Sequence, residues 1–148
     1  MKPFGIAMLL ALGLMLNACG GGSSNNSGNI NGNWTATLTD SSGNPVFAFT
    51  TTLTQSSGTS VSVTNLTFTS QTQCFTSGET ATGTFALTGN FNGNVTGTFA
   101  MTITSGVPSG NVLTLQGNVA NNTISGTWTL TGVTSGCTGN GNFTMTSM

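Results

Sequence analysis

From Gly32 onward, apolar and polar residues alternate with a period of two, and threonine occupies most of the polar positions. Successive side chains of a β-strand point to opposite faces, so this pattern predicts strands with one buried and one exposed face. No stretch after residue 20 shows the 3.6-residue repeat of an amphipathic helix. The alternating runs predict eight strands, over about residues 32–40, 46–55, 59–69, 80–88, 93–104, 111–119, 123–131 and 141–147.

Short stretches rich in Gly, Asn and Ser separate these runs, which favours antiparallel pairing of neighbouring strands. Asn121-Asn122 fits a two-residue hairpin turn, and a change of parity near Thr64–Asn65 predicts a β-bulge. Eight antiparallel strands in sequence order can close into a small barrel, which removes exposed strand edges. We therefore predict an all-β fold, an eight-stranded antiparallel up-and-down barrel, with a β-sandwich as the alternative.

The chain is almost uncharged. Its 148 residues include one base, Lys2, and two acids, Asp40 and Glu79, with no His and no Tyr. Nucleic-acid binding requires Lys and Arg against phosphates, and general acid–base catalysis relies mainly on His, carboxylates, Lys, Tyr and Cys. The composition therefore predicts a protein that is not an enzyme, uses no cofactor and binds no nucleic acid.

The N-terminus has the form of an export signal. Lys2 precedes an apolar run over residues 4–16, which is too short for a membrane span of about 20 residues. The run ends in Leu16-Asn17-Ala18-Cys19, which resembles the lipobox of bacterial lipoproteins. The resemblance implies that residues 1–18 are a signal peptide and that Cys19 carries a diacylglycerol thioether and a palmitate-type acyl chain on its amine. An ordinary secretory signal with an incidental Cys is the alternative.

The lipobox resemblance also divides the chain. Residues 19–30 form the lipidated Cys and a flexible tether rich in Gly, Ser and Asn, and residues 31–148 form the barrel domain. In bacterial lipoproteins an Asp just after the lipidated Cys tends to mean retention in the inner membrane. Gly20 stands at that position, so the resemblance implies a lipid anchor in the outer membrane, on its periplasmic or cell-surface face.

Cys74 and Cys137 remain as an even pair in an exported domain, which predicts a disulfide. The predicted topology is consistent with this disulfide. Cys74 follows the third strand and Cys137 follows the seventh, and these two loops lie at the same end of an up-and-down barrel. A zinc site lacks ligands, since the chain has no His and no third thiol beside this pair once Cys19 is lipidated.

Several predicted strands repeat the order Gly, polar, aromatic, as in Gly97-Thr98-Phe99 and Gly126-Thr127-Trp128. A Gly on the face of the aromatic residue leaves room for a neighbouring ring or permits the bending of a small barrel. Gly32-Asn33-Trp34 resembles the opening of calycins, the lipocalin and avidin superfamily. The stretch from Gly136 to Thr144 resembles uncharacterised Gly/Thr-rich bacterial lipoproteins, a likeness that implies no particular activity.

These observations predict a non-catalytic envelope lipoprotein whose loop end contacts a small apolar or neutral ligand or another envelope component. A purely structural or surface-interaction role, including glycan or ice contact through the Thr-rich face, is the alternative. The barrel interior is either a filled core or a calycin-like apolar cavity. The residues most suited to a ligand site are those of the longest loop and a tryptophan below it: Gln71, Gln73, Phe75, Glu79 and Trp128.

Overall fold

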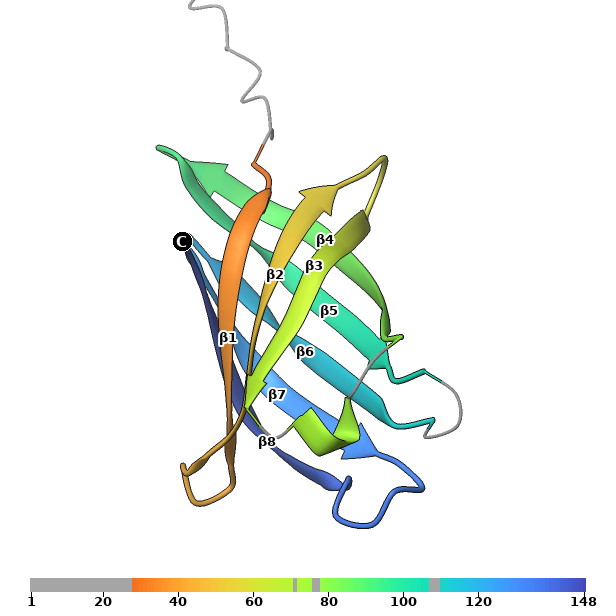
Figure 1. The fold of residues 1–148 in the computed structure, drawn as a ribbon. Coiled ribbons are helices and arrows are strands. Elements are labelled where there is room, and N and C mark those ends of the chain that lie inside the picture. The colour runs from red at the N-terminus through yellow and green to blue at the C-terminus, as the bar shows by residue number, and fades with distance from the viewer. Residues whose placement is uncertain (1–27, 71, 76–77, 107–109) are drawn as a thin grey trace, which may run out of the picture.

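The computed structural model describes residues 28–70, 72–75, 78–106 and 110–148. Eight strands in sequence order, each antiparallel to its neighbours, form a closed barrel (Figure 1). The predicted all-β, eight-stranded up-and-down barrel is confirmed, and the strands do not divide into two packed sheets. The strands are β1 (Gly32–Asp40), β2 (Pro45–Gln55), β3 (Ser60–Ser70), β4 (Thr80–Phe91), β5 (Asn94–Thr104), β6 (Val112–Ala120), β7 (Thr123–Thr131) and β8 (Gly139–Ser147).

A single 3₁₀ turn, η1 (Thr72–Cys74), follows β3. Within the described ranges no helix is long and apolar enough to cross a membrane. The predicted signal peptide, the lipidation site Cys19, most of the tether and Gln71 lie outside the described residues.

Two hairpin turns follow directly from local sequence. Asn121 takes a φ of 58° between Ala120 and Thr123, which are paired, so the predicted two-residue turn is confirmed. Asn92 and Gly93 take φ values of 51° and 80° in the turn between β4 and β5. Positive φ at both positions matches the twist of an antiparallel pair, so β4 continues to Phe91, three residues beyond its predicted end.

The predicted bulge in β3 is also present. Thr50 pairs with Thr67 and Thr52 with Thr64, so two residues of β3 face one residue of β2, and Asn65 takes a φ of 52°. The parity change at Asn65 keeps Val61 and Phe68 on the core side of the same strand.

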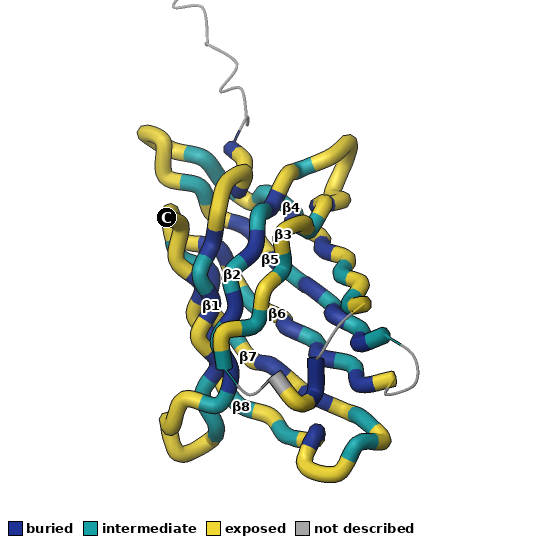
Figure 2. Tube along the Cα trace, viewed as in Figure 1, coloured by how far each residue is buried: buried dark blue, intermediate teal, exposed yellow. Residues whose placement is uncertain are grey.

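The barrel interior is occupied by one cluster of hydrophobic side chains. Figure 2 shows buried positions alternating with exposed ones along the strands. Most apolar residues of the alternating runs are buried, as predicted, and Val63 and Leu87 are half-buried against the cluster. Val119 and Ile124 of the alternating runs are buried as well, and two side chains from outside those runs join the cluster, Ile30 and Phe75. Of the two predicted interiors, a filled core or an apolar cavity, the buried cluster corresponds to the filled core.

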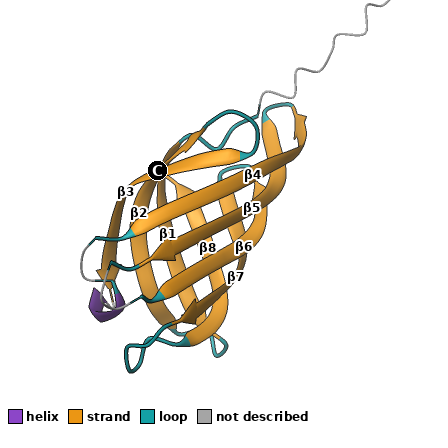
Figure 3. Ribbon diagram, turned by 90° about the vertical axis from the view of Figure 1, so that its right-hand side faces the viewer, coloured by secondary structure: helices purple, strands orange, loops and turns teal. Residues whose placement is uncertain are grey.

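The two ends of the barrel differ. The connections β1–β2, β3–β4, β5–β6 and β7–β8 lie at one end, called here the loop end (Figures 1 and 3). Gly28, Met148 and the short turns β2–β3, β4–β5 and β6–β7 lie at the other, called here the tether end. The three longest connections, β3–β4, β5–β6 and β7–β8, therefore all lie at the loop end.

Candidate functional site

A disulfide joins two connections at the loop end. Cys74 in η1 and Cys137 between β7 and β8 are bonded, with their Cα atoms 5.7 Å apart, and both are buried. The prediction of this pair is confirmed. The strand count on which it partly rested is correct as well, since an even number of strands between the two connections places them at the same end.

Asn111 links three of the loop-end connections. Its side chain is fully buried just before β6, and its Nδ2 donates to the Cys74 carbonyl oxygen at 3.0 Å and to the Thr134 Oγ1 at 3.3 Å. The Asn111 backbone N–H donates to the Ser105 Oγ at 2.7 Å, and the Ser105 N–H donates to the Asn111 carbonyl oxygen at 2.9 Å. One carboxamide therefore holds together the β3–β4, β5–β6 and β7–β8 connections.

A glycine makes room for this carboxamide. A Cβ added at Gly132 would overlap the Asn111 side-chain oxygen. The Asn111 side chain thus fills the space that a larger residue at 132 would occupy. Sequence reasoning did not find Asn111, because a Gly-Asn pair after Pro108-Ser109 looks like an ordinary turn before a strand.

The fourth connection, β1–β2, is ordered by Asp40. Its Oδ1 accepts the Ser42 N–H at 2.8 Å and the Asn44 N–H at 2.9 Å, and its Oδ2 accepts the Asn44 Nδ2–H at 3.1 Å. These hydrogen bonds, from the Asn44 backbone first and its side chain next, lower the pKa of the Asp40 carboxyl below its usual value. Asp40 therefore holds the turn as a carboxylate.

Aromatic rings close the interior beneath the loops. Phe75 stacks on Phe68 with ring centroids 4.5 Å apart and meets Phe47 edge-on at 6.4 Å. Trp128 meets Phe47 edge-on at 5.6 Å, and its Nε1–H donates to the Thr39 carbonyl oxygen at 2.8 Å. Phe75 and Trp128 are each 3% exposed, so both predicted site residues are part of the packed core beneath the loops.

The remaining predicted site residues lie differently. Gln73 is exposed within η1, and Glu79 is half-buried just before β4. The structure therefore joins Phe75 and Trp128 through Phe47, leaves Gln73 at the surface, and describes no contact between Glu79 and the aromatic rings. Among the described residues of the loop end, Val133 in the β7–β8 connection is a large apolar residue at 84% exposure.

No family model matches the chain, and no curated protein or solved structure matches it. Among the described residues, no three His, Cys, Asp or Glu side chains gather as potential metal ligands.

Proposed function

We propose that this protein is a non-catalytic lipoprotein, anchored in the bacterial outer membrane through Cys19, whose loop end recognises another component of the cell envelope. The observation that carries the proposal is the ordering of the loop end. Binding surfaces on loops are most effective when the loops are held rigid before the partner arrives, because less conformational entropy is lost on binding. The Cys74–Cys137 disulfide and Asn111 link the described parts of three connections, which supports such preorganisation.

The aromatic rings beneath the loops favour surface recognition over ligand storage inside the barrel. An apolar ligand entering from the loop end would have to displace Phe75 from Phe68 and Phe47. Phe75 directly follows Cys74, whose position is fixed by the disulfide to Cys137. Displacing Phe75 would therefore also strain the backbone beside the disulfide. A neutral partner bound on the outside meets Gln73 and Val133 without any such cost.

The anchoring half of the proposal is tested with Cys19→Ala. We expect wild-type protein to sediment with outer membranes and to enter the detergent phase on Triton X-114 partitioning. Cys19→Ala should accumulate as precursor or appear as a soluble exported protein. Unchanged detergent partitioning of Cys19→Ala contradicts lipidation at this residue.

The recognition half is tested by site-specific photo-cross-linking in living cells. A photoreactive residue is placed at Gln73 or Val133 on the loop end, and a matched control is placed at Thr127, which is exposed on the middle of β7. We expect discrete cross-linked products from the two loop-end positions and none of the same mobility from Thr127. Products that are identical at all three positions, or absent from the loop end, contradict recognition there.

A further inference from the structure

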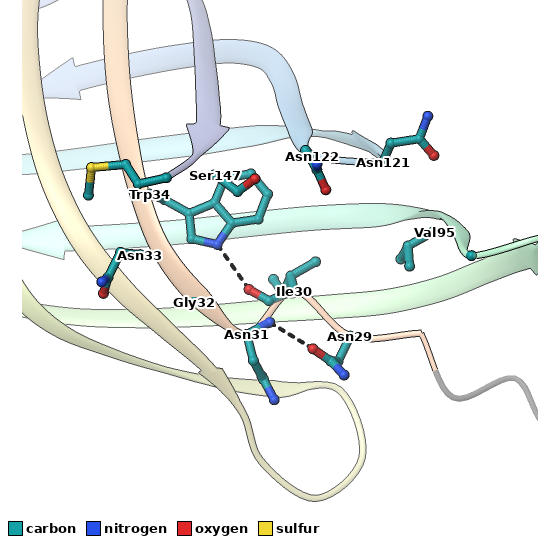
Figure 4. A pocket seen from close by; sticks show the side chains of 12 residues that line it. Asn29, Ile30, Asn31, Gly32, Asn33, Trp34, Val95, Asn121, Asn122 and Ser147 are labelled. Carbon is teal, nitrogen blue, oxygen red and sulfur yellow. Dashed lines mark hydrogen bonds between the residues drawn. The ribbon is translucent and has the colours of Figure 1, made fainter.

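The tether end carries a pocket that the proposed function does not use. Its volume is about 240 Å³, and it lies between the start of β1, the β4–β5 and β6–β7 turns and the C-terminal residues. Figure 4 shows asparagine side chains from several segments around it. Its polar lining consists of side-chain carboxamides and a hydroxyl, contributed by Asn29, Asn31, Asn33, Asn121, Asn122 and Ser147.

A second hollow of about 230 Å³ lies beside the first, on the outer wall. The two cavities share Asn33 and Met148, and the second adds Asn65 and the threonines at positions 50–52. Thr52 Oγ1 donates to the Asn33 Oδ1 at 2.7 Å, and Asn65 Nδ2 donates to the Thr52 Oγ1 at 3.2 Å, so the junction is ordered. The two adjacent hollows, which share Asn33 and Met148, are together called here the carboxamide groove.

The asparagines of the groove leave donors available for a ligand. The Oδ1 of Asn29 accepts the Asn31 N–H at 3.0 Å, and the Oδ1 of Asn31 accepts the Gln55 N–H at 2.6 Å. The Oδ1 of Asn33 is used by Thr52. Within the described part of the chain, the Nδ2 groups of these three asparagines have no hydrogen-bond partner, and neither have the side chains of Asn121 and Asn122.

The backbone around the first hollow is held in place. The Trp34 Nε1–H donates to the Ile30 carbonyl oxygen at 2.9 Å, and both residues are buried. The Asn121 N–H donates to the Val95 carbonyl oxygen, and the Ser147 N–H donates to that of Asn122, at 2.8 and 3.1 Å. The available carboxamides thus stand on a rigid frame, as a preformed binding site requires.

The chemistry of the lining selects the ligand. Carboxamides both donate and accept hydrogen bonds, which suits hydroxyl groups, and the groove has no cationic side chain to favour an anion. Each hollow has the volume of about eight water molecules, roughly that of one sugar ring with its hydroxyls.

We propose that the carboxamide groove binds a neutral saccharide of at least two sugar units. The ligand is either a free oligosaccharide or the neutral sugar headgroup of a membrane glycolipid, because both present the same hydroxyl chemistry. The site lies at the end of the barrel opposite the loop end, so it goes beyond the proposed function and stands without it.

The experiment follows the side-chain amide NMR signals of the full-length protein in detergent without sugar headgroups. One arm titrates maltotriose, cellotriose and N-acetylglucosamine trimer, with a monosaccharide and trigalacturonate for comparison. The other arm compares phosphatidylcholine bicelles with and without monoglucosyl diacylglycerol. Shifts of the Asn121 and Asn122 signals in the first arm assign a free saccharide, and shifts only in the second assign a glycolipid headgroup.

Variants separate the groove from the rest of the surface. Asn122→Phe places a ring at the mouth of the first hollow and should abolish the shifts, and Asn121→Gly, which preserves the positive φ, should weaken binding about two- to tenfold. Asn140→Ala, an exposed carboxamide of β8 outside the groove, should leave binding unchanged. All variants are compared at matched folding, judged by their backbone spectra.

The outcomes that overturn the proposal are equally specific. They are no shift with any saccharide in either arm, equal binding by Asn122→Phe, or tighter binding of trigalacturonate than of the neutral trisaccharides. A trisaccharide that binds no more tightly than the monosaccharide contradicts the extended groove. None of these results bears on cross-linking at the loop end, so failure of one proposal leaves the other standing.

Discussion

At the scale of single residues, a few polar or small side chains determine local geometry that the alternating pattern does not specify. Asn111 is buried without charge and is fully hydrogen-bonded, which offsets the cost of removing a carboxamide from water. Gly97 is a second case. A Cβ there would overlap the Phe85 ring of the neighbouring strand, so this Gly of the Gly-x-aromatic repeat leaves room for a ring, as the sequence predicts.

Replacement of Asn111 by Ala should destabilise the barrel by about 2–3 kcal/mol, because it removes several hydrogen bonds and leaves the buried Cys74 carbonyl oxygen without its donor. Chemical denaturation measures the free energy of unfolding. Asn118→Ala, at an exposed position on β6, the strand that follows Asn111, is the matched control and should change this free energy by less than about 0.5 kcal/mol. Equal effects of the two substitutions contradict the role assigned to Asn111.

Gly97→Ala should destabilise the barrel by about 1–3 kcal/mol, since the added methyl group overlaps the Phe85 ring and also the Ala86 carbonyl oxygen. The double variant Gly97→Ala with Phe85→Leu removes the part of the ring that the methyl group meets. In a double-mutant cycle its cost should be smaller than the sum of the two single costs. Additive costs would show that the methyl group does not act through the ring.

At the scale of secondary-structure elements, the wall of the barrel is uneven. β3 pairs with β4 only at Ser60–Ser62 against Thr82–Thr84, whereas β2 pairs with β3 as far as Ser70. The contact is short because the β3 bulge at Asn65 bends the strand and η1 follows its end. Phe75, which follows η1, stacks on Phe68 of β3 and covers part of the core at this side.

Backbone amides in the second half of β3 should therefore exchange hydrogen faster than those of β5 and β6. β5 is paired on both sides, to β4 and to β6, along most of its length. Hydrogen–deuterium exchange followed by NMR or mass spectrometry compares residues 66–70 with residues 98–103. Equal protection of the two segments would show that another part of the chain covers the β3 edge.

The outer faces of the strands also form ordered rows. The pairing register places one threonine from each of five neighbouring strands side by side, in the order Thr67, Thr50, Thr35, Thr146 and Thr123. Strands of a small barrel twist relative to one another, so such a row curves around the wall rather than lying flat. The curvature disfavours ice contact, which requires a flat array, and leaves an uncharged hydroxyl surface.

At the scale of the whole molecule, the near absence of charge makes the barrel depend on burial, backbone pairing and one disulfide. The disulfide joins residues 63 positions apart, which stabilises the fold by about 4 kcal/mol on the chain-entropy account. No ionisable side chain lies in the core cluster apart from the two bonded cysteines. Global stability should therefore respond strongly to reduction and weakly to pH.

Thermal unfolding measured across pH tests this expectation. The chain has no His, so we expect nearly constant stability between about pH 5 and pH 8. The folded-state pKa of Asp40 is lowered, so its stabilising contribution is present above the unfolded value near 3.8 and is lost as pH falls through the lower folded value. Asp40→Asn should reduce the acid-side loss. A steep change of stability between pH 5 and pH 8 contradicts this account.

The sequence by itself determined the strands, their antiparallel order, the inward face and the disulfide. Period-two alternation and turn residues such as Asn121 act locally, and the parity of connections in a meander places Cys74 and Cys137 at one end without further information. What only the tertiary structure decided are contacts between segments far apart in the chain. Phe75 is part of the core because its ring contacts Phe47 and Phe68. Asn111 links three connections because barrel closure brings them together around its side chain. The carboxamide groove exists because barrel closure brings Asn29, Asn121 and Ser147 to the same end.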